Sequence, residues 1–162
     1  MAHARIGEIV ISADRGDELV ALGLGSCVAV VMTDVRVGVA GLAHVMLPEA
    51  GPDRATPGKY ADTAIPELLA RVVEVGAARG RLRVAIAGGA AMFGSASRLD
   101  IGSRNVAAVT AALAGVGLPC QAQATGGDRG RTVRVDVASG SASIREAGGP
   151  ELSLLAPPSV LR

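Results

Sequence analysis

Aromatic side chains are almost absent from this sequence of 162 residues, which has no Trp, one Tyr and one Phe. A hydrophobic core must therefore be built from Ala, Val, Leu and Ile, which favours closely packed layers of strand and helix. The scarcity of rings also removes the platforms on which single-stranded nucleic acids stack. Because the net charge is only +1, the chain lacks the basic field that phosphate backbones require. We expect no nucleic-acid partner.

Cysteine is equally scarce, with Cys27 and Cys120 as the two thiols of the chain. They show neither the C-x-x-C spacing of many redox and zinc sites nor the dense framework of small secreted domains. A zinc site is also disfavoured, because the sequence holds only two His beside the two Cys. We expect reduced thiols, no metal and no cofactor.

Long hydrophobic runs are missing as well. No window approaches the roughly 18 apolar residues that a membrane-spanning helix needs. The first 20 residues reach Glu8 before any long apolar stretch develops, which is unlike a signal peptide or an anchor. We expect a cytoplasmic protein without membrane insertion.

The composition that is present fits one globular domain. Hydrophobic residues make up 49% and charged residues 19%, and a chain of this size buries about 68 to 70% of its unfolded surface. Strands are expected at 5–11, 28–32 and 82–87, where short β-branched runs end at turn-forming residues. We predict a single-domain α/β fold, a mixed β-sheet sandwich with helices packed on it.

Two helices are expected, of which the first is amphipathic. From Thr63 the apolar positions recur with helical spacing, with Asp62 or Thr63 as N-cap and Gly80 as the stop. A second helix is expected at 104–114, capped by Ser103.

The remainder of the chain is β in character. Residues 120–125 and 132–138 alternate around a Gly-rich turn and predict a hairpin. We predict a domain over residues 1–146 and a flexible Gly/Pro-rich tail over 147–162.

The segment LGLGSCVAV, residues 22–30, places Cys27 between two glycines and an apolar strand. If Asp34 to Val37 form the turn of the following hairpin, Cys27 faces His44 across the two strands. Facing side chains lie about 4.5 to 5.5 Å apart at Cβ, which suits a thiol activated by an imidazole. Gly25 and Ser26 could direct N–H groups toward an oxyanion. These features predict acyl transfer through a thioester.

The residues alone leave other interpretations open. A cysteine in an apolar context is usually an inert core residue, and His44 could be a hydrogen-bonded structural histidine. The G-x-G of residues 23–25 is a weak nucleotide signal, because a strand and not a helix follows it. A cysteine protease or a transglutaminase would share the same nucleophile.

Six segments, in this order and spacing, resemble the CheD family of chemoreceptor glutamine deamidases. They are LGLGSCVAV, GLAHVMLP, KYADTAIPELL, AGGAAMF, IGSRNVAAV and TGGDRGRTVRVDVASG. The resemblance covers roughly residues 5–145. It implies a hydrolase that converts glutamines on the cytoplasmic helices of methyl-accepting chemotaxis receptors into glutamates. It also implies a fold similar to the catalytic domain of the cytotoxic necrotizing factor toxins.

The resemblance assigns Cys27 as nucleophile and His44 as base and then acid. A third catalytic position, six residues before the cysteine, is Thr in the family and is Ala21 here. A backbone carbonyl could orient His44 instead, a hydroxyl such as that of Ser26 could substitute, or activity could be reduced; we favour the carbonyl.

The resemblance also suggests a second role, in which a weakly catalytic module couples receptors to a CheC-type phosphatase. The other residues that match the family pattern are assigned structural roles; they are Tyr60, Gly88, Gly89, Asn105, Gly126, Gly127 and Arg131.

Overall fold

A computed structural model describes residues 1–92 and 100–159, whose strands form two five-stranded sheets. The outer sheet has the order β1, β3, β8, β9, β10 and the inner sheet the order β2, β5, β4, β6, β7. Both sheets are mixed, because β1 runs parallel to β3 and β7 parallel to β6. The outer strands are Ala2–His3, Glu18–Leu24, Arg131–Asp136, Ala142–Glu146 and Glu151–Leu155 for β1, β3, β8, β9 and β10. The inner strands are Ile9–Ser12, Val28–Asp34, Val39–Val45, Arg83–Gly88 and Ala122–Thr125 for β2, β4, β5, β6 and β7.

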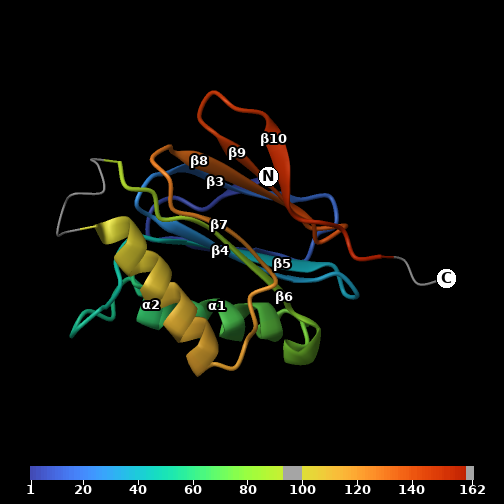
Figure 1. The fold of residues 1–162 in the computed structure, drawn as a ribbon. Coiled ribbons are helices and arrows are strands. Elements are labelled where there is room, and N and C mark those ends of the chain that lie inside the picture. Colours follow the sequence, from blue (N-terminus) through green and yellow to red (C-terminus); the bar gives the residue numbers. More distant parts are fainter. Residues whose placement is uncertain (93–99, 160–162) are drawn as a thin grey trace.

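The inner sheet is the middle layer of the molecule. The outer sheet covers one of its faces, and helices α1 (Ala61–Glu74) and α2 (Ile101–Gly115) lie on the other, as Figure 1 shows. Strands β4 and β5 are buried along their whole length, as expected for strands covered on both faces. The predicted α/β sandwich with helices packed on it is confirmed.

The helices form where the apolar period predicted them, with different ends. α1 begins after Tyr60, earlier than expected, and ends before Gly76, a glycine with φ of +114°. A short 3₁₀ turn at Pro57–Lys59 precedes α1, and a second one at Arg79–Arg81 follows it. The N-cap of α2 is Asp100, whose carboxylate accepts a hydrogen bond from the Ser103 N–H, so the prediction that Ser103 is the cap is wrong. Phe93 of the AGGAAMF segment lies outside the described residues.

The hairpin between β4 and β5 has a different register from the one predicted. Asp34 pairs with Val39, and the loop between them ends at Gly38, whose φ of +67° suits a glycine. Ala29 therefore faces His44, and the predicted facing pair of Cys27 and His44 is wrong. The predicted register differs from the observed one by two residues, which is a full period of a strand. Cys27 and His44 therefore still lie on the same face of the sheet, as predicted.

The predicted hairpin of residues 120–125 and 132–138 is also wrong. β7 adds to the inner sheet beside β6, whereas β8 lies between β3 and β9 in the outer sheet. Gly126 and Gly127, with φ of +81° and +71°, take the chain from one sheet to the other.

The chain ends show more structure than the sequence suggested. Residues 151–155, expected to belong to a flexible tail, form β10 and pair with β9. Residues 2 and 3 pair with β3. The domain boundary at residue 146 stays a prediction. Neither described helix is long and apolar enough to cross a membrane.

Candidate active site

Cys27 and His44 lie on the same face of the inner sheet. His44 faces Ala29, and Cys27 stands two residues before Ala29, just outside β4. Cys27 and Ala29 both pack in the core between the two sheets, as does Leu42, two residues before His44. The thiol and the imidazole are thus diagonal neighbours, a relationship in which α-carbons are about 7 to 8 Å apart and long side chains still meet.

The ring of His44 is held by a backbone group of the N-terminal segment. The side chain is 1% exposed, and its Nδ1 lies 2.9 Å from the carbonyl oxygen of Ala4. A carbonyl only accepts hydrogen bonds, so Nδ1 carries the proton and donates it. In the neutral ring Nε2 is then an unprotonated acceptor, and this buried atom has no hydrogen-bond partner among the described residues.

Burial keeps both groups in their neutral forms. It raises the pKa of the Cys27 thiol above its ordinary value of 9.0. It also lowers the pKa of His44 below 6.5, although the Ala4 carbonyl and the charge of Glu8 act in the opposite direction. The resting site therefore holds a thiol and a neutral base, and not a thiolate paired with an imidazolium.

Ala21 occupies the buried position on β3 where the family pattern has a hydroxyl. It is fully buried and pairs with Val133 of β8. The Ala4 N–H donates to the carbonyl of Val20, the neighbour of Ala21, at 2.8 Å. Strand β3 thereby places the Ala4 carbonyl against the ring of His44, which is the arrangement that we favoured for a chain without the hydroxyl.

Three successive carbonyls fix the loop that carries Cys27. Those of Gly25 and Cys27 accept from the N–H groups of Ala90 and Gly89, both at 2.8 Å. The carbonyl of Ser26 accepts from the side-chain amide of Asn105 at 3.0 Å. Among residues 1–92 and 100–159, no backbone group accepts a hydrogen bond from the N–H of Ser26 or Cys27. These two donors are available to an oxyanion.

The loop rests on a turn that only glycine can form. Gly88 has φ of +114°, and a Cβ built there would lie 2.2 Å from the carbonyl oxygen of Cys27. Buried Arg131 donates to the carbonyls of Gly88 and Gly126 at 3.2 and 2.7 Å. Family-pattern residues to which the sequence assigned structural roles thus surround the Cys27 loop.

A cavity of about 410 Å³ opens beside His44. Leu22 and Ile6, which are 53% and 58% exposed, form its apolar rim. The other lining residues are His3, Ala4, Arg5 and His44. Sequence reasoning missed the N-terminal lining, because the contribution of Ala4 is a main-chain carbonyl that no side-chain pattern reveals.

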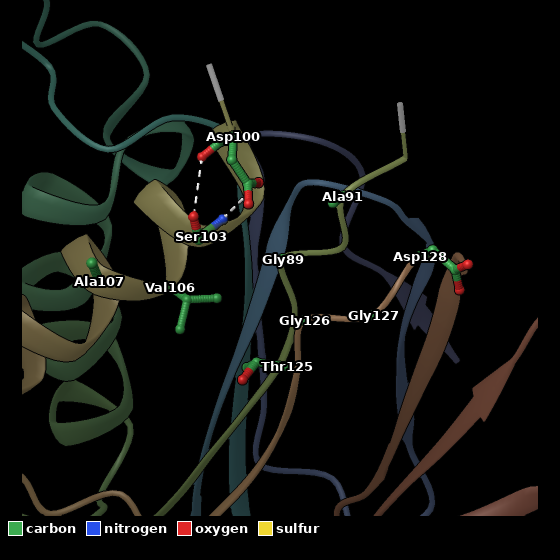
Figure 2. A pocket seen from close by; sticks show the side chains of 10 residues that line it. All are labelled: Gly89, Ala91, Asp100, Ser103, Val106, Ala107, Thr125, Gly126, Gly127 and Asp128. Atoms are coloured by element: carbon green, nitrogen blue, oxygen red, sulfur yellow. Dashed lines mark hydrogen bonds between the residues drawn. The ribbon is translucent and has the colours of Figure 1, made fainter. Parts of the chain in front are cut away.

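A larger cavity, of about 750 Å³, includes among its lining residues Gly89, whose N–H donates to the Cys27 carbonyl. Figure 2 shows it between the start of α2, at Asp100 and Ser103, and the turn at Gly126 and Gly127. Cys27 lines neither cavity, and His44 lines only the smaller one, so the smaller cavity is the candidate substrate site. Within the described part of the chain, no group of three or more His, Cys, Asp or Glu could hold a metal ion.

Comparisons with known proteins define the class. The sequence profile of a family described as CheD chemotactic sensory transduction matches residues 46–146, a span that includes Asn105 and Arg131 but neither Cys27 nor His44. The chemoreceptor glutamine deamidase CheD of Thermotoga maritima is 45% identical over 146 residues, which cover 90% of this chain and 92% of that protein. A protein of Methanococcus maripaludis strain C5, named "Probable chemoreceptor glutamine deamidase CheD", is 42% identical over 153 residues, 93% of this chain and 97% of that protein.

The resemblance noted in the sequence is thus confirmed over nearly the whole chain. The chain belongs to the CheD family of chemoreceptor glutamine deamidases.

Proposed function

We propose that this protein deamidates glutamine side chains of chemotaxis receptors through a thioester on Cys27. The observation that carries the proposal is the free, buried Nε2 of His44 on the sheet face that also holds the thiol. The names of the relatives supply the substrate class.

The first half-reaction forms the thioester and releases ammonia. Nε2 of His44 takes the proton from the Cys27 thiol, and the sulfur attacks the carboxamide carbon. The oxygen becomes an oxyanion, held by the N–H groups of Ser26 and Cys27. The protonated Nε2 then gives its proton to the leaving nitrogen, the C–N bond breaks and ammonia departs.

The second half-reaction uses the same groups on water. Nε2 takes a proton from a water molecule, whose oxygen attacks the thioester carbon. The C–S bond breaks, and the thiolate recovers the proton from His44. Glutamine and water have become glutamate and ammonia, and the enzyme is unchanged. No step uses a metal or an organic cofactor.

The Ala4 carbonyl performs the orienting role that the family pattern gives to a hydroxyl at position 21. By accepting from Nδ1, it fixes the tautomer in which Nε2 is the base. It also stabilises the imidazolium that forms during catalysis, because its dipole points its negative end at the charged ring. A main-chain acceptor in a strand is as rigid as a side chain and needs no rotamer to be fixed.

The receptor helix docks on the apolar rim formed by Ile6 and Leu22. These exposed side chains border the cavity at His44, so a helix lying across them could insert one glutamine beside His44, on the sheet face that also holds Cys27. Met92, which is exposed, adds apolar surface next to Gly25, with its Cγ 3.1 Å from the position of a Cβ built on Gly25. Receptor methylation segments are cytoplasmic in the family, so we place this action in the cytoplasm.

A second function is favoured by one observation, the absence of a hydroxyl at Ala21. A family member with reduced activity could serve mainly as a binding module that couples receptors to a CheC-type phosphatase. The two functions differ in whether the purified protein releases ammonia.

The test is ammonia release from a purified receptor cytoplasmic fragment, with mass spectrometry to locate each glutamine converted to glutamate. We expect wild type to release ammonia and Cys27→Ala to release none. Cys120→Ala is the matched control, because Cys120 is the exposed free thiol outside the site. Equal activity in wild type and Cys27→Ala would refute the thioester mechanism. No release from wild type, with a CheC-type phosphatase still bound, would support the binding module.

A further inference from the structure

A buried amide on α2 connects the two chain segments that carry Cys27 and His44. Asn105 is fully buried, and its Nδ2 donates to the carbonyl of Ser26 at 3.0 Å and to that of Met46 at 2.9 Å. Ser26 directly precedes Cys27, and Met46 follows His44 by two residues. One side chain thus holds both segments from the helical side of the inner sheet.

The position of these contacts is at the end of the β4 and β5 ladder. The last paired residues are Val28 and Val45, and in the same register the next pair would be Cys27 with Met46. Instead of a further rung between the two backbones, the Asn105 amide bridges them. The separation of the strands that carry the thiol and the imidazole is thereby set by a side chain from a third element.

Asn105 lowers the stability of the fold at this position, and it does not stabilise the helix. It is the fifth residue of α2, inside the helix and not at its cap, where Asn has a poor helix propensity. Its Oδ1 is buried without a partner among the described residues, and an unsatisfied buried polar atom costs about 1 to 3 kcal/mol. The neighbouring buried residues of the helix face, Val109 and Leu113, are apolar. The bridge between Ser26 and Met46 is the compensating gain.

We propose that Asn105 is a positioning residue that sets the distance and orientation of Cys27 relative to His44. It touches neither reacting atom and acts through the two carbonyls. The inference deepens the proposed deamidase function, but it requires only that the thiol and the imidazole act together. Loss of the bridge lets the two segments separate, and a misplacement of about 1 Å can lower a rate by about 10²-fold.

The test compares Asn105→Leu with Val109→Ala. Leu has nearly the shape of Asn but donates to neither carbonyl. Val109→Ala removes packing one turn further along the same buried face and leaves the bridge intact, so it controls for loss of stability. We expect Asn105→Leu to lower kcat about 10²-fold with little change in KM, and Val109→Ala to keep kcat per folded molecule within about twofold.

A second readout follows the coupling of the pair without the deamidation reaction. Alkylation of Cys27 by iodoacetamide, in a Cys120→Ala background, is measured with and without His44→Ala. We expect His44 to accelerate alkylation in the parent protein and to have almost no effect in Asn105→Leu. If Asn105→Leu does not fold, Asn105→Ser serves, since one hydroxyl proton can reach only one of the two carbonyls.

The inference is overturned if the His44 effect on alkylation is the same with and without the amide, or if it is absent from the parent protein. It is also overturned if Asn105→Leu lowers kcat no more than Val109→Ala does. If the parent releases no ammonia but His44 accelerates alkylation only when Asn105 is present, the proposed function fails and the positioning role stands.

Discussion

The Nδ1 of His44 and the carbonyl oxygen of Ala4 lie 2.9 Å apart, so the group that orients the imidazole comes from the chain segment following β1. Strand β3, beside which this segment runs, presents a methyl group at Ala21. In the mechanism that we propose, the orienting role therefore belongs to a backbone atom of a neighbouring segment and not to the side chain at position 21.

Restoring the hydroxyl at position 21 should not increase activity. The side chain is fully buried, so Ala21→Thr adds atoms to a packed site and should cost about 1 to 3 kcal/mol of folding free energy. Because Nδ1 already donates to Ala4, we expect kcat to stay within about twofold. Ala21→Val has the same shape without the hydroxyl and is the matched control. A tenfold gain in kcat for Thr over Val, measured by ammonia release, would contradict the role of the carbonyl.

The activity should persist in mild acid. His44 works as a neutral base, and burial lowers its pKa, so the acid limb of kcat/KM should lie below pH 6.5. Burial also raises the pKa of Cys27, so alkylation by iodoacetamide should keep rising above pH 9.0. The pH profiles of kcat/KM and of the alkylation rate test these two expectations. An acid limb above pH 6.5 would contradict the lowered pKa of His44. An alkylation rate that has already reached its plateau near neutral pH would instead indicate a resting thiolate and imidazolium pair.

The same ring should destabilise the fold in acid. The unfolded chain binds a proton on His44 near pH 6.5, whereas the folded chain binds it only at lower pH. Between these two values the unfolded state holds more protons, so the free energy of unfolding decreases as the pH falls. Urea denaturation of wild type and His44→Gln as a function of pH should show a smaller decrease in the variant. Parallel curves would exclude a buried neutral His44.

The local elements of this fold could be predicted from the sequence, because their signals are local. The apolar spacing after Thr63 and the β-branched runs at 28–32 and 82–87 each specify a helix or a strand within a short window. The partners of strands could not be predicted in this way. β7 pairs with β6, from which α2 separates it, and β8 pairs with β3, more than 100 residues earlier in the chain.

At the candidate site, too, local features could be predicted from the sequence and tertiary contacts could not. The motif around Cys27 and His44 indicated the pair, and their shared face survived a register error because two residues are one full period of a strand. Their supports could not be predicted, since a carbonyl at Ala4 and a buried amide at Asn105 act through tertiary contacts alone. Cys120 is a further case, because the sequence does not show that its thiol is exposed.

The turn beneath the nucleophile should tolerate no side chain. A Cβ at Gly88 would lie 2.2 Å from the Cys27 carbonyl oxygen, so Gly88→Ala must displace the Cys27 loop. Gly148→Ala is the control, because its φ of +76° is also positive but nothing lies within 4 Å of a Cβ built there. We expect about 1 to 3 kcal/mol of strain in both variants and loss of ammonia release in Gly88→Ala alone. Equal activity of the two variants would show that the loop adapts.

The apolar rim should affect substrate binding and not the chemistry. Leu22 is 53% exposed at the cavity beside His44, and full burial of a leucine under a receptor helix is worth about 1.5 to 3 kcal/mol. Leu22→Ser should therefore raise KM for the receptor fragment by roughly 10- to 100-fold with kcat nearly unchanged. Leu152→Ser is the control, since Leu152 is 60% exposed on β10 and lines a different cavity. If both variants change KM equally, the helix does not dock at the His44 cavity and another face of the molecule must hold it.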